Sequence, residues 1–447
     1  MRCLDRPVLR IIKVNKFKVS SEANFATSGQ SRQDIKCDLL VVGGGAGGCS
    51  MAAKFASKLG KNKVVIVEPK DVHYYQPMWT LVGGGMKTLA DSGRAMASVL
   101  PSDAHWVKDQ VAEFSPKTNS VRTKGGDSIQ YNFMLVAVGL KLDFHKIKGL
   151  EDALAKDPRV CSNYSPLYVD KTFKALQNFQ GGPALFTFPN TPIKCAGAPQ
   201  KVMYIFEEYL RKHGKRDAAD IKYYTSLGVI FGVKKYAAVL LELCKKRGIE
   251  VTFRHNLIEV NSSASEATFE NLDKPGGTLT QKYSFLHATP AMSTPEVLSK
   301  CADLVDKAGY LEVSKTNLQH VRFPNIFGIG DCTNAPTSKT AAAVAGQCGV
   351  VKKHLAAVMA GKPLPSVAYD GYTSCPLVTG YSSCILAEFD YDGQPLETLP
   401  FDQGKERWST FFMKKTIMPQ LYWHAMLNGY WEGPKLFRKA FHLGMGK

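Results

Sequence analysis

The stretch CDLLVVGGGAGG, residues 37–48, joins a short, mainly apolar run to a row of small residues. The run Cys37–Val42 predicts a buried parallel strand. The residues that follow satisfy the pattern G-x-G-x-x-G at Gly43, Gly45 and Gly48. Glycines in this pattern allow a tight turn and let the backbone approach a pyrophosphate closely. The stretch therefore predicts a dinucleotide-binding turn.

The residues after this turn continue the same pattern. Cys49–Leu59 has helical character, and the N-terminus of such a helix offers free N–H groups to a pyrophosphate. A second apolar strand, Lys63–Val67, ends at Glu68, 20 residues after the last glycine, where this fold places a carboxylate for a ribose hydroxyl. Because strand, turn, helix, strand and acid occur in order, a purely structural glycine turn is the weaker alternative. The predicted dinucleotide contacts are Gly43, Gly45, Ala46, Gly47, Gly48 and Glu68.

Two later segments indicate which dinucleotide is bound. Phe133–Gly139 (FMLVAVG) and Phe323–Asp331 (FPNIFGIGD) are apolar strands that end in small residues and in Gly-Asp, respectively. The pair resembles the flavoprotein reductases with two dinucleotide-binding domains, and the resemblance implies FAD. It also implies that Asp331 binds the flavin's ribityl chain and that the helix beginning near Lys339 points its N-terminus at the flavin ring, with a simple helix cap as the alternative for Asp331. Further FAD contacts are expected at Gln76, Val111, Ala137, Gly139, Asp331, Lys339, Thr340, Ala341 and Ala342.

These segments predict an α/β fold with two Rossmann-like dinucleotide-binding domains, of which the FAD domain is discontinuous. In the inserted second domain, the candidate nicotinamide fingerprint is Ile221–Val233, whose glycines Gly228 and Gly232 are four residues apart with no third glycine at the required spacing. We therefore expect a reductant other than a nicotinamide. The expected organisation is a transit peptide (1–33), the first segment of the FAD-binding domain (34–148), a second Rossmann-like domain (149–302), the second segment of the FAD-binding domain (303–365) and a C-terminal redox-cysteine and membrane segment (366–447).

Two of the eleven cysteines lie in unusual settings. Cys195 follows a proline-framed turn and has Lys194 and Lys201 beside it in the sequence; nearby cations favour the nucleophilic thiolate. Cys375 is followed directly by a proline, which indicates a second loop. Sequence alone does not show whether Cys195 and Cys375, 180 residues apart, meet.

Several long stretches resemble one family, the mitochondrial sulfide:quinone oxidoreductases: residues 73–84, 186–200 (FTFPNTPIKCAGAPQ), 225–236, 327–343, 369–380 (YDGYTSCPLVTG) and 418–445. The resemblance implies FAD as cofactor, hydrogen sulfide as electron donor, ubiquinone as acceptor, and sulfite or glutathione as acceptor of the sulfur. It implies a redox pair of Cys195, facing the flavin, and Cys375, carrying the transferable sulfur. Cys161, near a third cysteine of some non-mitochondrial members, is interpreted as incidental. An NADH:quinone oxidoreductase of the same superfamily is the alternative.

The charge and the C-terminal residues indicate a membrane surface. Lys and Arg outnumber Asp and Glu by 57 to 39 over the 447 residues, which favours anionic partners. Residues 401–447 contain ten aromatic residues, and Lys435–Met445 places Leu436, Phe437, Ala440 and Phe441 on one helical face with Arg438 opposite. Such a helix is typical of interfacial association, although a helix that covers the core has the same pattern. Outside this segment, no run of basic residues interleaved with aromatic residues indicates a nucleic-acid-binding site.

The N-terminal residues 1–33 contain seven basic and two acidic residues among several serines. This composition is typical of a mitochondrial transit peptide. With the resemblance, it predicts peripheral attachment to the mitochondrial inner membrane. The histidines, His73 included, show no metal-ligand spacing, so no metal is expected.

Overall fold

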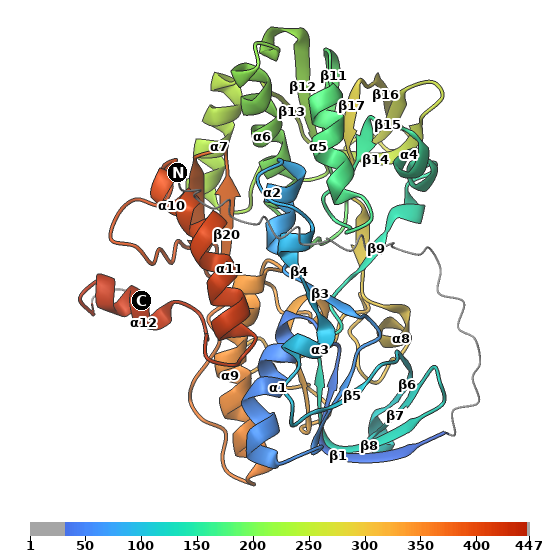
Figure 1. The fold of residues 1–447 in the computed structure, drawn as a ribbon, viewed down its shortest axis with the longest axis vertical. Coiled ribbons are helices and arrows are strands. Elements are labelled where there is room, and N and C mark those ends of the chain that lie inside the picture. Colours follow the sequence, from blue (N-terminus) through green and yellow to red (C-terminus); the bar gives the residue numbers. More distant parts are fainter. Residues whose placement is uncertain (1–31, 445–447) are drawn as a thin grey trace, which may run out of the picture.

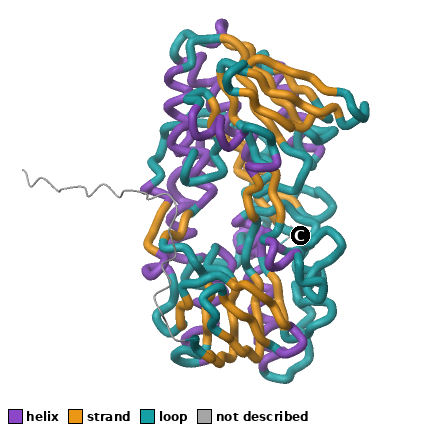
Figure 2. The backbone as a smooth tube through the Cα atoms, turned by 90° about the vertical axis from the view of Figure 1, so that its right-hand side faces the viewer, coloured by secondary structure: helices purple, strands orange, loops and turns teal. Residues whose placement is uncertain are grey.

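The computed structural model describes residues 32–444. Its strands gather towards two ends of the long axis (Figure 2), and the chain passes from the lower unit to the upper one and back (Figure 1). The transit-peptide prediction falls almost wholly on residues 1–31, outside the described residues.

The lower unit is a seven-stranded sheet in which β1, β2, β5, β8 and β19 are parallel. The carboxyl halves of β1 and β8 are buried, as expected when helices cover a parallel sheet. The sheet comprises β1 (Asp34–Val42), β2 (Val64–Val67), β5 (His105–Val107), β8 (Ser128–Val136) and β19 (Ile326–Gly328), with the antiparallel strands β6 (Val111–Ser115) and β7 (Ser120–Thr123) at one edge.

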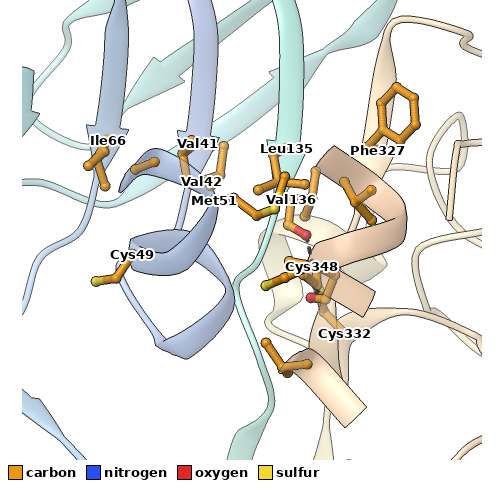
Figure 3. Close-up of a cluster of buried hydrophobic side chains, with 14 of the residues drawn as sticks. Val41, Val42, Cys49, Met51, Ile66, Leu135, Val136, Phe327, Cys332 and Cys348 are labelled. Atoms are coloured by element: carbon orange, nitrogen blue, oxygen red, sulfur yellow. Dashed lines mark hydrogen bonds between the residues drawn. The ribbon is translucent and has the colours of Figure 1, made fainter. Parts of the chain in front are cut away.

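Helices α1 (Ala46–Leu59) and α9 (Ala341–Met359) lie side by side along the lower unit (Figure 1). Figure 3 shows Met51 of α1 and Cys348 of α9 close to Val41 and Leu135 of the sheet. Chain segments far apart in sequence therefore build one core: β19 enters the sheet beside β8, with Ile326 opposite Met134.

The upper unit has the parallel strand order β10-β17-β11-β12-β13. Its elements are β10 (Val160–Cys161), β11 (Gly182–Phe188), β12 (Ala219–Thr225), β13 (Glu250–Thr252), β17 (Phe285–His287), α5 (Val169–Asn178), α6 (Ala198–Lys212) and α7 (Lys234–Lys246). An antiparallel sheet of β14 (His255–Asn261), β15 (Glu266–Asn271) and β16 (Thr278–Lys282) packs beside it. The two Rossmann-like sheets confirm the predicted α/β class.

The topology corrects the place where a nicotinamide fingerprint was sought. The segment Ile221–Val233 lies at β12 and the turn before α7, in the crossover from β12 to β13. A Rossmann unit carries its glycine motif in the turn after its central strand; here that strand is β11, and the turn is 189–197 before α6. That turn contains one glycine, Gly197, and the cysteine Cys195. The expected absence of the motif therefore applies to this turn as well.

The C-terminal region begins with a two-stranded hairpin, β20 (Thr373–Val378) and β21 (Cys384–Phe389). Cys375 lies in β20, so the prediction that it belongs to a loop is wrong. A helical run then descends from the upper unit along the lower one (Figure 1). It comprises α10 (Trp408–Phe412), a π-helical turn (Met413–Ile417), α11 (Met418–Leu421), a second π-helical turn (Tyr422–Met426) and, after a loop, α12 (Lys435–Phe441).

The face pattern predicted for the last helix is partly wrong. Leu436, Phe437 and Phe441 of α12 are exposed, but Arg438, expected among the exposed cations, is buried over the ring of Tyr372. None of the helices within residues 32–444 is long and apolar enough to cross a membrane.

Candidate active site

The glycine turn after β1 is shaped by close backbone contacts. Gly43 has φ +103°, and a Cβ on Gly48 would lie 1.8 Å from the Gly43 oxygen. Both positions therefore require glycine. A Cβ on Gly45, by contrast, would meet nothing within 4 Å. Open space thus adjoins Gly45, directly before the first residue of α1, Ala46.

The Glu68 carboxylate lies against this turn. One oxygen accepts a hydrogen bond from the Gly44 N–H at 2.7 Å, and the other accepts one from the Lys70 N–H at 2.9 Å. The side chain thus orients the turn, which is a role that the sequence pattern did not reveal. Its contact with a ribose stays a prediction.

Asp331 lies in the turn before α9, beside two lysines. Burial raises the pKa of its carboxyl, while the charges of Lys194 and Lys339 act in the opposite direction. Lys339 Nζ donates to the backbone oxygen of Asp331 at 2.7 Å, and no hydrogen bond from a described residue reaches the carboxylate itself. Helix α9 is capped by Thr340, whose hydroxyl accepts from the Ala343 N–H at 3.0 Å. The alternative that Asp331 caps this helix is therefore wrong.

Ala137, Gly139, Gln76 and Val111, also predicted to contact the cofactor, lie in three different places. Ala137 and Gly139 follow the carboxyl end of β8, where the Ala137 oxygen closely approaches Gly43. Gln76 lies beside the cysteine turn and accepts a hydrogen bond from Lys194 Nζ at 3.4 Å. Val111 is buried at the start of the edge strand β6, opposite Thr123, and contacts none of the other predicted residues through a hydrogen bond. A cavity at the N-terminus of α9 is lined by Gly330, Asp331, Thr337, Lys339, Thr340, Ala343 and Gln347, among others.

The structure brings Cys195 and Cys375 together. Their sulfurs are 3.3 Å apart, and a disulfide bond measures about 2.05 Å. Cys195 adopts a left-handed conformation with φ +53°, and its N–H donates to the Lys339 oxygen at 2.8 Å. This contact ties the cysteine turn of the upper unit to the segment that precedes α9 in the lower unit.

The two thiols have opposite electrostatic character. The pKa of Cys195 is well below its ordinary value because the Cys375 thiol donates a hydrogen bond to it and because Lys201 lies near. Lys201 Nζ is 3.4 Å from the Cys195 sulfur. The pKa of Cys375 is raised well above its ordinary value by the same thiol–thiol hydrogen bond and by burial. The surroundings thus favour Cys195 over Cys375 as the thiolate of the pair.

A second cation near the pair was not found by sequence reasoning. Lys194, expected beside the sulfur, turns to Gln76. Lys414, from the first π-helical turn, is buried, donates to the Pro77 oxygen at 2.9 Å, and helps to lower the pKa of Cys195. Burial, together with the charge of Lys201, lowers the pKa of Lys414 to about 8. The neighbouring lysines Lys414 and Lys415 were visible in the sequence, but nothing local indicated which of them turns inward.

The other described cysteines differ from Cys195. Burial raises the pKa of Cys37, Cys161, Cys348 and Cys384 to about 12. The Cys161 thiol makes its hydrogen bond to the Leu286 oxygen. Within residues 32–444 no group of His, Cys, Asp and Glu has the arrangement of a metal site.

Comparison with known proteins gives consistent results. Residues 37–174 match the family described as pyridine nucleotide-disulphide oxidoreductase. The chain is 55% identical to the mitochondrial sulfide:quinone oxidoreductase of Mus musculus over 91% of this chain and 90% of that one. It is 44% identical to the Dictyostelium discoideum protein of the same name over 88% and 87%. The crystal structure of the Aquifex aeolicus sulfide:quinone oxidoreductase shares the fold, with a TM-score of 0.72 and 18% identity over 92% of this chain and 95% of that one.

Proposed function

The chain belongs to the mitochondrial sulfide:quinone oxidoreductase family, and from this premise we propose that Cys195 and Cys375 carry the sulfide chemistry. Sulfide is the electron donor and ubiquinone the acceptor. In the resting enzyme, one or more sulfur–sulfur bonds bridge the two cysteines. The single observation that supports this pair most strongly is the 3.3 Å separation of their sulfurs next to the Lys201 ammonium.

The first step is a thiol–disulfide exchange. Hydrosulfide attacks the bridge at the Cys375 sulfur, and the bridging bond breaks as the new one forms. The sulfide sulfur becomes the outer atom of a persulfide on Cys375, and its proton goes to solvent. The electron pair of the broken bond leaves with Cys195 as a thiolate. Lys201 and Lys414 stabilise that thiolate, which makes Cys195 the better leaving group.

The second step removes the outer sulfur from Cys375 and restores the bridge between the two cysteines. The outer sulfur of the persulfide passes to a nucleophilic acceptor, sulfite or glutathione, and leaves Cys375 as a thiolate. The Cys375 thiolate then bonds to the Cys195 sulfur to form the bridge again, and the two electrons released go to ubiquinone, the final acceptor. Since sulfite, glutathione and hydrosulfide are all anions, the buried lysines favour their approach.

Three observations support FAD as the cofactor. Open space adjoins Gly45 at the start of α1, Glu68 lies beside the turn, and the Asp331 carboxylate has no hydrogen bond from the described residues. The turn 43–48 would hold the pyrophosphate, and Asp331 the ribityl chain. When bound, FAD supplies the two-electron relay between a thiolate and a quinone. Cys195 faces this region through its contact with Lys339.

We further propose peripheral attachment to the mitochondrial inner membrane through residues 408–443. Large apolar side chains are exposed along this segment: Trp408, Phe412, Ile417, Tyr430, Leu436, Phe437, Phe441 and Leu443. Exposed Lys435 and Lys439 on α12 add positive charge. An apolar surface with neighbouring cations fits the interface of an anionic bilayer, where ubiquinone is dissolved.

An anaerobic flavin titration tests this function. Sulfide alone should bleach the visible band of the purified flavoprotein, and NADH alone should not. Cys195→Ser and Cys375→Ser should both lose the response, while Cys37→Ser, which replaces a buried cysteine of β1 in the lower sheet, should keep it. Bleaching by NADH with both cysteine variants unaffected would refute the proposal in favour of an NADH:quinone oxidoreductase.

A further inference from the structure

His73 lies between the glycine turn and the C-terminal helical segment. Its ring is buried, with Nδ1 3.0 Å from the Gly44 oxygen and Nε2 2.6 Å from the Tyr422 hydroxyl. Gly44 belongs to the dinucleotide-binding turn, and Tyr422 opens the second π-helical turn, 349 residues from His73. One side chain thus bridges two parts of the chain that sequence separates widely.

The hydrogen bonds define the state of this imidazole. A carbonyl oxygen only accepts, so Nδ1 must carry the proton that His73 shares with Gly44. The other nitrogen, Nε2, then has a free lone pair and accepts from the Tyr422 hydroxyl. Burial lowers the pKa of His73 to about 4, so the ring is neutral at physiological pH and this arrangement persists. Nδ1 therefore donates a hydrogen bond and Nε2 accepts one.

The Gly44 peptide is held on both sides. Its N–H donates to Glu68 at 2.7 Å, and its oxygen accepts from His73 and from the Cys49 thiol, the latter at 3.1 Å. The orientation of this peptide determines where the neighbouring N–H groups point, and these are the groups that meet a pyrophosphate. Displacement of His73 would therefore change the shape of the turn.

The C-terminal segment is fastened to the lower unit at a second place as well. The Tyr422 ring packs against Tyr75 with a centroid distance of 4.4 Å. Further along, Glu432 accepts from Lys54 of α1 at 2.7 Å and from Lys352 of α9 at 2.8 Å. The segment thus contacts both the turn and the helix that the turn begins.

We propose that His73 and Tyr422 are positioning residues that link the dinucleotide-binding turn to the C-terminal segment, so that cofactor retention and the seating of this segment stabilise each other. The linkage is reciprocal, because a coupling free energy between two sites acts equally in both directions. It rests on the proposed function, which places FAD at this turn. Since the same C-terminal segment carries the apolar surface proposed to meet the membrane, the His73–Tyr422 hydrogen bond would connect the cofactor turn to the membrane contact.

The first test is the release of FAD from the holoenzyme on dilution, followed by flavin fluorescence. Tyr422→Phe removes only the hydroxyl, and Tyr430→Phe is the matched control because that ring is 82% exposed. We expect release to be two- to fivefold faster in Tyr422→Phe and unchanged in Tyr430→Phe. A fivefold change corresponds to about 1 kcal/mol at 1.4 kcal/mol per tenfold, the usual contribution of one neutral hydrogen bond.

A histidine variant can remove the Tyr422 bond and keep the Gly44 bond. The amide of Asn can lie near the position of Nδ1 and keep the contact with the Gly44 oxygen, but it does not reach the position of Nε2. We expect His73→Asn to resemble Tyr422→Phe and the double variant to be no worse than either single one, because all three lack the same bond. Independent, additive effects on release would overturn the linkage.

Hydrogen exchange in the holoenzyme supplies a second readout. In Tyr422→Phe, exchange should rise at residues 43–49, and in His73→Asn it should rise at residues 422–427, while β11 in the upper unit stays unchanged as an internal control. If Tyr422→Phe matches Tyr430→Phe in both release and exchange, the inference fails even if His73→Asn does not fold. Purified protein without flavin would instead refute the proposed cofactor.

Discussion

Lys201→Met tests whether the Lys201 ammonium keeps Cys195 ionised. At 3.4 Å and an effective dielectric constant of about 20, two unit charges attract by about 5 kcal/mol. Since one pKa unit corresponds to about 1.4 kcal/mol, the charge accounts for at most ~3.6 units. Removal of the charged group leaves the Cys375 hydrogen bond and Lys414 in place, so we expect the pKa of Cys195 to rise by about 2 units, within the usual range for one neighbouring charge.

The assay is the pH dependence of alkylation of the reduced enzyme by iodoacetamide, with modification of Cys195 counted by mass spectrometry. Only the thiolate reacts, so at a pH below both midpoints the variant should react about 100-fold more slowly, the factor that corresponds to a shift of about 2 units. Lys201→Arg should retain most of the rate because it keeps the charge. Lys212→Met, on the same helix but half-exposed, is the matched control. A midpoint in Lys201→Met within half a unit of the wild-type value would refute the electrostatic role of Lys201.

Three further predictions concern single contacts. Gly45→Ala should fold with an unchanged Tm but bind FAD more weakly, because its Cβ enters open space. Gly48→Ala should lose more than about 3 kcal/mol of stability or fail to fold, because its Cβ would lie 1.8 Å from a backbone oxygen. Thermal unfolding and flavin content are measured for both variants. Urea denaturation should show that the wild type gains stability relative to Lys414→Met between pH 8 and pH 10: the pKa of Lys414 is about 8 in the folded protein against an ordinary value of 10.5, so at this site the unfolded chain binds more protons in this window. Phe437→Asp in α12 should reduce flotation with anionic vesicles.

Each of these predictions has an outcome that contradicts it. Equal flavin content in Gly45→Ala and wild type would mean that the open space does not receive the cofactor. A difference in unfolding free energy between wild type and Lys414→Met that does not change from pH 8 to pH 10 would contradict the lowered pKa of Lys414. Val321→Asp, which replaces another half-exposed apolar residue outside the C-terminal segment, is the control for Phe437→Asp, and equal flotation of Phe437→Asp and wild type would remove α12 from the membrane surface.

The features that sequence reasoning predicted depend on neighbours in the chain. The turn 43–48 follows its strand and precedes its helix directly, so its pattern is local, and the same holds for the lysine and proline residues around Cys195. The features that sequence reasoning missed depend on long-range packing. No local signal reveals that Lys414 turns inward from a π-helical turn, or that His73 meets Tyr422 across 349 residues. Cys375 was assigned to a loop because proline rarely lies in a strand, but β20 pairs only with β21, and an edge strand tolerates proline.

The pairing of β19 with β8 also determines the order in which the molecule can be completed. Ile326 lies opposite Met134, so about 190 residues must be synthesised before the edge of β8 is covered, which takes on the order of 10 to 40 s at typical elongation rates. During that time a buried parallel edge is open to other chains. The strands of the upper sheet, the last of which is β17, are thus synthesised while the lower sheet is still incomplete. A fragment that stops before residue 326 retains the dinucleotide-binding turn but exposes an apolar edge, so we expect it to aggregate.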